Sequence, residues 1–98
     1  MIINGNLYLI SSEIESLGKI KTVNGKLNLR GCYKLISLGD LEFVDQTLVL
    51  SGCKNLKDLG KLRKLNNRYS IKLLESGITK EYIEKEKPWL KYNCDWNN

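Results

Sequence analysis

One pattern of hydrophobic residues and glycines occurs twice in the central part of the chain. The two copies are offset by 21 residues and match at nine positions. The first copy holds Val23, Leu27, Leu29, Gly31, Cys32, Leu35, Leu38, Gly39 and Leu41, and the second holds Val44, Leu48, Leu50, Gly52, Cys53, Leu56, Leu59, Gly60 and Leu62. A fixed period of about twenty residues is typical of a solenoid, in which each coil buries its apolar side against its neighbours.

Weaker copies of the pattern flank this pair. The first coil ends at Thr22, is one residue shorter, and has Ser12 in the place of the cysteine. A fourth coil is expected to start at Leu65, with the side chains of Tyr69, Ile71 and Leu74 pointing inward. The sequence therefore predicts a single domain over residues 1–98, with four coils in 3–74.

Each coil contains a stretch in which hydrophobic and polar residues alternate, as in a half-buried strand. Residues 26–30 show the alternation, and equivalent strands are expected at 6–10, 47–51 and 68–72. Strands that recur at a constant period predict one narrow parallel sheet. The leucines that follow are spaced by three, which favours a 3₁₀ or extended return segment, and the glycines after them are expected to turn with positive φ at Gly18, Gly39 and Gly60.

Two stretches resemble the core of a leucine-rich repeat, including its Asn/Cys position: Leu27-x-Leu29-x-x-Cys32-x-x-Leu35 and Leu48-x-Leu50-x-x-Cys53-x-x-Leu56. They depart from that family at Asn24, where a leucine is usual. The resemblance covers about residues 3–74. The chain is similar to the short irregular repeats of phage and bacterial proteins. It implies a β-rich fold, α/β by leucine-rich-repeat convention, that binds a partner through its sheet face and implies no particular reaction.

The pairs Asn4-Gly5 and Asn24-Gly25 suggest an alternative fold, because Asn-Gly is a strong hairpin signal. Hairpins at these pairs would give an antiparallel meander. A later coil has Asp45-Gln46 instead, and glutamine is unfavourable at positive φ. The repeat is therefore preferred, and the meander is kept as the alternative.

Residues 75–98 are expected to form a helical cap over the last coil. Thr79 can cap the start of a helix that runs through Lys87, and Pro88 ends it or starts a further turn. The segment is the most aromatic of the chain, with Tyr82, Trp89, Tyr92 and Trp96. A cap is what a terminal repeat requires, and the N-terminal end has none. We therefore expect a weak or moderate homodimer through the uncovered edge at 6–10, or use of this edge to dock the partner.

Few residues offer catalytic chemistry. The chain has no histidine, the commonest general base and zinc ligand. Its three cysteines, Cys32, Cys53 and Cys94, are an odd number, which fits a reducing compartment, and the first two are expected to be buried as small hydrophobes. We expect no enzyme, no cofactor and no metal. Without a signal peptide or a long apolar run, the chain is expected to be cytoplasmic and not to bind a membrane.

The outward positions of the four strands carry basic residues and no acidic ones, although the net charge of +5 also serves solubility. This pattern predicts contact with an acidic surface of a protein partner through Tyr8, Lys26, Asn28, Arg30, Val49, Arg68 and Lys72.

The expected function is a non-enzymatic protein-binding module. One form is a phage-encoded inhibitor that occupies a site on a host enzyme or defence complex, such as an anti-CRISPR; Lys- and Asn-rich usage suits a phage source. The alternatives are a nucleic-acid-binding protein that uses the basic sheet face, and a structural repeat protein without activity of its own. Nucleic acid is less favoured, because stacking platforms need several exposed aromatics and only Tyr8 lies on this face.

Overall fold

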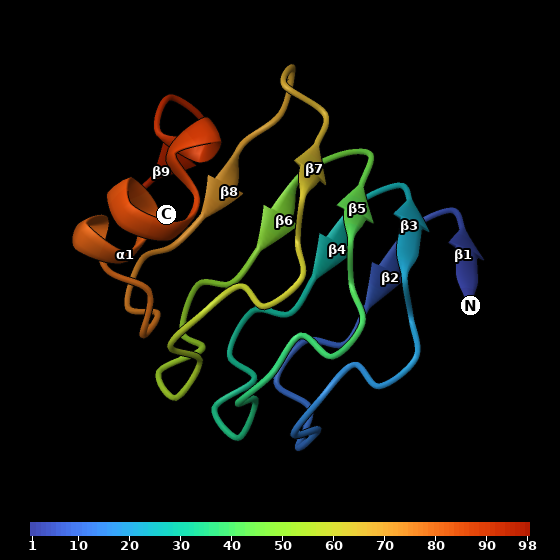
Figure 1. Ribbon diagram of the computed structural model, residues 1–98. Helices are drawn as coiled ribbons and strands as arrows, with labels where there is room; N and C mark the ends of the chain where they lie inside the picture. Colours follow the sequence, from blue (N-terminus) through green and yellow to red (C-terminus); the bar gives the residue numbers. More distant parts are fainter.

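The computed structural model describes residues 1–98 and shows an α/β protein with two parallel sheets and one short α-helix (Figure 1). Sheet A consists of β1 (Ile2–Asn4), β3 (Thr22–Asn24), β5 (Phe43–Val44) and β7 (Lys64–Leu65). Sheet B consists of β2 (Leu7–Tyr8), β4 (Leu27–Asn28), β6 (Leu48–Val49), β8 (Ile71–Lys72) and β9 (Cys94–Asp95). The chain passes alternately through the two sheets, and one passage through both is called a coil below.

Successive coils pair in parallel, as the constant period predicts. Leu7 pairs with Leu27, and Leu27 pairs with Leu48. The alternative antiparallel meander is wrong, because β1 pairs with β3 and not with its neighbour β2. The Asn-Gly pairs instead lie at the corners where the chain passes from sheet A to sheet B.

Sheet A was not expected from the sequence. Its strands are two or three residues long, which is too short for alternation to be recognised. Polar side chains connect them along the outside: Asn24 Nδ2 donates to Asn4 Oδ1 (2.9 Å), and Asn66 Nδ2 donates to Asp45 Oδ1 (3.3 Å). The asparagines that suggested hairpins therefore belong to a ladder between coils.

The fourth coil is out of register with the sequence prediction. Leu48 pairs with Ile71, so the corner before β8 is two residues longer than the period requires. Leu73 is consequently the buried residue, with 2% of its surface exposed, whereas Tyr69 and Leu74 are each 38% exposed. The inward positions predicted for Tyr69 and Leu74 are wrong.

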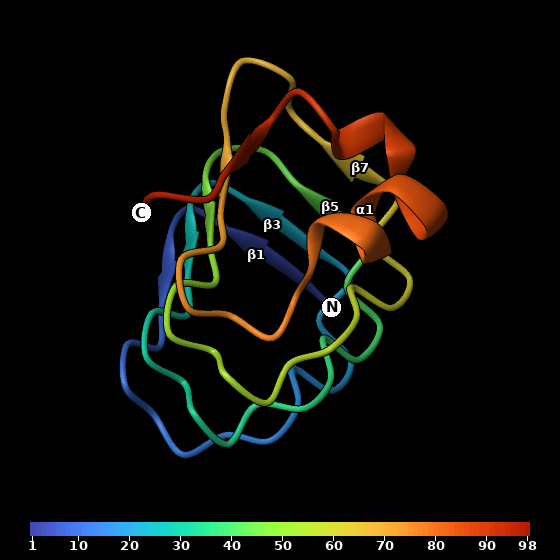
Figure 2. The same ribbon diagram turned by 90° about the vertical axis from the view of Figure 1, so that its left-hand side faces the viewer.

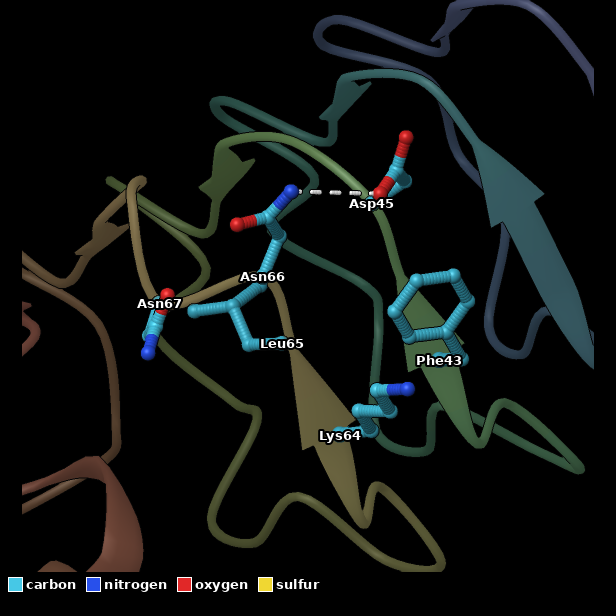
Figure 3. Close-up of a pocket in the computed structure, with 6 residues that line it drawn as sticks. All are labelled: Phe43, Asp45, Lys64, Leu65, Asn66 and Asn67. Atoms are coloured by element: carbon cyan, nitrogen blue, oxygen red, sulfur yellow. Dashed lines mark hydrogen bonds between the residues drawn. The ribbon is translucent and has the colours of Figure 1, made fainter.

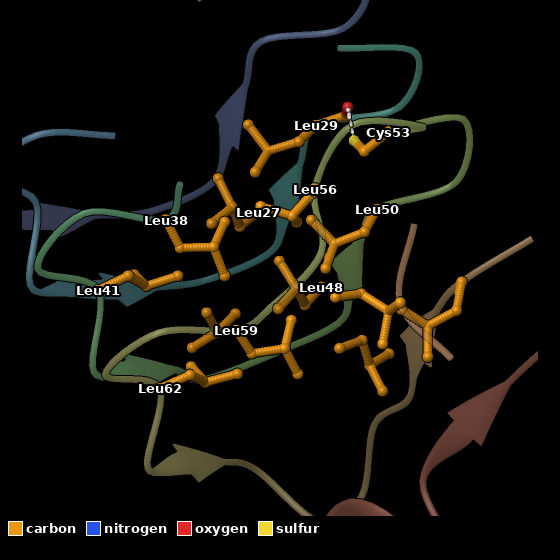
Figure 4. Packing of buried hydrophobic residues seen from close by; sticks show 14 of the residues in the cluster. Leu27, Leu29, Leu38, Leu41, Leu48, Leu50, Cys53, Leu56, Leu59 and Leu62 are labelled. Carbon is orange, nitrogen blue, oxygen red and sulfur yellow. Dashed lines mark hydrogen bonds between the residues drawn. The ribbon is translucent and has the colours of Figure 1, made fainter. Parts of the chain in front are cut away.

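The hydrophobic core lies between the two sheets and the return segments (Figure 4). Every non-glycine residue of the nine matched positions has 0% exposure in both copies. Full burial of a leucine stabilises a fold by roughly 1.5–3 kcal/mol, so these residues are the main source of stability. Cys32 and Cys53 are buried as expected, and each thiol also donates to the preceding coil: Cys32 Sγ to Leu9 O (2.9 Å) and Cys53 Sγ to Leu29 O (3.1 Å).

The C-terminal segment covers the last coil (Figure 2). It contains α1 (Lys80–Glu86), which Thr79 caps as predicted, and the 3₁₀ turn η1 (Pro88–Leu90). The Tyr82 hydroxyl accepts from Leu59 N (2.9 Å), while Lys87 Nζ donates to the carbonyl oxygens of Gly60 and Leu62. The cap therefore satisfies polar backbone groups as well as covering leucines. Neither helix has the length and apolar composition that crossing a membrane requires.

The N-terminal end has no comparable cover. β1 and β2 are the edge strands of sheets A and B, so one side of each is unpaired. Met1 and Ile2 are 67% and 61% exposed. The expected difference between the two ends is confirmed.

The positive φ expected of Gly18, Gly39 and Gly60 is confirmed, and it yields a matched pair of variants. Gly18 and Gly39 have φ of 59° and 60°. An added Cβ at Gly39 would lie 2.4 Å from Gly18 O, whereas at Gly18 nothing lies within 4 Å. Gly18→Ala should cost about 1–2 kcal/mol from φ alone, and Gly39→Ala should cost more, because the coils must also move apart. Urea unfolding measures both; equal losses would contradict this close packing.

Candidate functional site

The sheet-B face consists of the side chains that point outward from β2, β4, β6, β8 and β9 and from the residues beside them. The paired positions along its middle are Tyr8, Asn28, Val49, Lys72 and Asp95. Lys26 and Arg30 flank Asn28 on the same side, because the leucines between them are fully buried. The alternation predicted for this strand is therefore confirmed.

The N-terminal half of this face combines aromatic, aliphatic and cationic groups. Tyr8 is 54% exposed and Ile10 is 52% exposed. No acidic side chain forms an ion pair with Lys26 or Arg30. Asn28 Oδ1 accepts from the backbone N–H of Arg30 (3.0 Å), which holds the amide in place beside the cations. We call Tyr8, Ile10, Lys26, Asn28 and Arg30 the N-terminal patch.

Ile10 was missed as a site residue by the sequence analysis. The alternation in 6–10 predicts that Ile10 points outward, but the contact residues were predicted from basic charge, which isoleucine lacks. An exposed isoleucine beside a tyrosine gives the patch apolar area that charges alone do not supply.

The C-terminal half of the face differs from the prediction. Lys72 Nζ lies 3.4 Å from Asp95 Oδ2, so the lysine is not a free cation. Hydrogen bonds from the Asn98 side chain and the Asn97 N–H, together with Lys72, hold the pKa of Asp95 below its usual range. The expectation of a face without acidic residues is wrong, because the C-terminal segment adds β9 to the four expected strands and places Asp95 beside Lys72.

Two further predicted contact residues are not available there. Val49 points outward but is only 3% exposed, so it offers almost no contact area. Arg68 lies in the corner between β7 and β8, where its backbone N–H donates to Asn66 Oδ1 (3.1 Å). Of the seven predicted contact residues, the structure brings together four in the N-terminal patch: Tyr8, Lys26, Asn28 and Arg30.

A hollow of about 330 Å³ lies on the outer side of sheet A (Figure 3). Phe43, Asp45, Lys64 and Asn66 are among its lining residues. These groups satisfy one another, since Asn66 donates to Asp45 and Lys64 Nζ lies 5.3 Å from the centroid of the Phe43 ring. The hollow thus has one carboxylate, Asp45, and one amine, Lys64, and each is engaged with a neighbouring side chain.

Two of the three cysteines, Cys53 and Cys94, do not offer an activated nucleophile. All three thiols are free. Burial raises the pKa of Cys53 to about 11 and also raises that of Cys94. Thiols with raised pKa are protonated at neutral pH and react slowly. No group of three or more Cys, Asp or Glu side chains is arranged to hold a metal ion.

Comparison with known proteins adds no relative. No protein-family model matches the chain, and no curated protein or solved structure matches it. Any inference about function therefore rests on the chemistry of the N-terminal patch and of its surroundings.

Proposed function

We propose that the chain is a non-enzymatic protein-binding module whose N-terminal patch contacts an acidic surface of a partner. The observation that carries this proposal is the combination of Tyr8 and Ile10, each about half exposed, with two cations that have no acidic partner within the chain. Apolar area can supply binding energy, and unpaired cations can select an acidic surface.

The backbone beneath the patch supports this role. Leu27 and Leu29 are fully buried on either side of Asn28, and β4 is paired on both sides, with β2 and with β6. Because this backbone is already ordered, binding through its side chains costs little additional backbone entropy. Tyr8 is the expected energetic anchor, whereas Lys26 and Arg30 mainly set the association rate and its salt dependence.

The proposal includes the architecture. Parallel pairing of four successive coils, with fully buried leucines at equivalent positions of the second and third coils, supports a short solenoid that resembles leucine-rich repeats. The narrower form, a phage-encoded inhibitor of a host enzyme or defence complex in the cytoplasm, has support only from the Lys- and Asn-rich composition.

Charge reversal tests the patch. Lys26→Glu with Arg30→Glu should raise the Kd for the protein partner at least about tenfold at low salt, because two attractive contacts become repulsive. Lys54→Glu with Lys57→Glu is the control: it changes net charge equally, at exposed positions outside sheet B. The partner is captured from lysate of the native host, identified by mass spectrometry, and its affinity is measured by calorimetry.

The melting temperature of the Lys26/Arg30 variant should stay within about 2 °C of the original, since surface charges that form no ion pair contribute little to stability. Equal affinity of the reversed and original proteins would show that the patch is not the binding site. If only DNA or RNA binding is lost, with a steep salt slope, the nucleic-acid alternative replaces the proposal.

We also propose weak self-association through the uncovered N-terminal end. The unpaired sides of β1 and β2 can pair with a second copy, and Ile2 adds exposed apolar area there. Ile2→Lys should lower the dimer fraction in sedimentation velocity at high protein concentration. Ile36→Lys, at an isoleucine 58% exposed outside both sheets, should not. A strict monomer at every concentration would contradict the dimer.

A further inference from the structure

A small cavity of about 140 Å³ lies where the chain leaves sheet B. It borders the N-terminal patch, because Arg30 belongs to both. Its other lining residues come from the third and fourth coils, next to the second coil that supplies Arg30 and Gly31: Ser51, Gly52, Leu74 and Glu75. Three neighbouring coils thus contribute to one cavity.

Ser51 has a hydroxyl without a hydrogen-bond partner. The residue is 4% exposed, and its Oγ is the one buried side-chain nitrogen or oxygen atom of the chain that lacks a partner. Leaving a buried polar group unpaired is unfavourable, so such a group in a folded protein calls for an explanation. A ligand that pairs with the hydroxyl provides one.

The other polar groups of the cavity identify the ligand. Gly31 N and Gly52 N already donate to carbonyl oxygens of the next coil, Ser51 O (2.8 Å) and Leu74 O (2.9 Å). The free side-chain donors are the Ser51 hydroxyl and the guanidinium of Arg30, which has no acidic partner. A guanidinium binds a carboxylate through two parallel hydrogen bonds, and a hydroxyl beside it can donate a third.

Glu75 is the acidic residue among those that line the cavity. It has φ of +59° although it is not glycine, and it takes the place that Gly31 and Gly52 hold in the earlier coils. Ser11 has φ of +54° at the equivalent place of the first coil, so the positive φ belongs to this corner of every coil. Its carboxylate forms no ion pair with Arg30, so it adds negative charge that opposes an anionic ligand.

We propose that this cavity is a subsite for a carboxylate side chain, aspartate or glutamate, of the protein partner. The proposal rests on the proposed function and deepens it. Arg30 holds the carboxylate, and Ser51 donates to it after a local rearrangement, because its Oγ is covered in the unbound structure. Glu75 limits the affinity.

The first test uses two blocked peptides and ¹⁵N NMR of the intact protein. The probe is acetyl-Gly-Glu-Gly-amide, and acetyl-Gly-Gln-Gly-amide is a control of the same shape without the charge. The glutamate peptide should give saturable shifts, with a Kd near ~1 mM, at the amides of Ser51, Gly52 and Glu75. Identical shifts from both peptides, or shifts spread over all surface lysines, would overturn the subsite.

Three variants give effects of different sign. Ser51→Ala should raise the melting temperature, because the unpaired hydroxyl is removed, and should weaken peptide binding about fivefold, as the loss of one hydrogen bond predicts. Glu75→Gln should strengthen binding about threefold or more, through the loss of like-charge repulsion. The control Glu81→Gln, in α1 outside the cavity, should leave binding unchanged. Unchanged binding by both Ser51→Ala and Glu75→Gln would refute the assignment.

The same variants separate this inference from the proposed function. With the captured partner, loss of binding on reversal of Lys26 and Arg30 but normal binding by Ser51→Ala would refute the subsite alone. Normal binding by the charge-reversed protein would refute the proposed function itself. If inorganic phosphate binds this cavity saturably and more tightly than the glutamate peptide does, the carboxylate subsite is refuted. The ligand would then be a phosphate group of the partner.

Discussion

The parallel backbone hydrogen bonds between successive coils are the constraint on which the rest of this structure depends. A single coil cannot bury its apolar side by itself and must pack against its neighbours. The pairing between coils brings equivalent leucines, such as Leu27 and Leu48, into contact positions in the core. The same pairing fixes which residues face outward. Position and environment of the N-terminal patch thus follow from the register of the strands beneath it.

A stack of coils must also end, and the two ends do so differently. At the C-terminal end, Tyr82 and Lys87 satisfy backbone groups of the third coil, and β9 extends sheet B by one strand. That strand also brings Asp95 beside Lys72 and neutralises part of the sheet-B face. The cap therefore changes the charge of the sheet-B face, since Lys26 and Arg30, which form no ion pair, lie on strands away from β9.

The sequence predicts the parts of the fold that depend on the period, but it does not predict length changes within a coil. Buried leucines, positive φ at Gly39 and the capped helix start at Thr79 were all accessible. The longer corner before β8 could not be predicted, because Ile71 and Leu74 also supply hydrophobic residues at the inward positions of the unshifted register. Sheet A and β9 were missed since such short strands are defined by their pairing partners. For the site, the alternation predicts the outward positions of Lys26 and Arg30 correctly. The unpaired hydroxyl of Ser51 could not be predicted, because it depends on how neighbouring coils pack around this side chain.

Nuclear Overhauser contacts in ¹⁵N,¹³C-labelled protein test the parallel register most directly. The register predicts backbone contacts between Leu7 and Leu27 and between Leu27 and Leu48, residues about twenty positions apart in the chain. A hairpin at Asn24-Gly25 would instead place Thr22 opposite Leu27. Contacts of the first kind, without the second, would confirm the stacked coils. Contacts between Thr22 and Leu27 would contradict them, and with them the surface on which the proposed function depends.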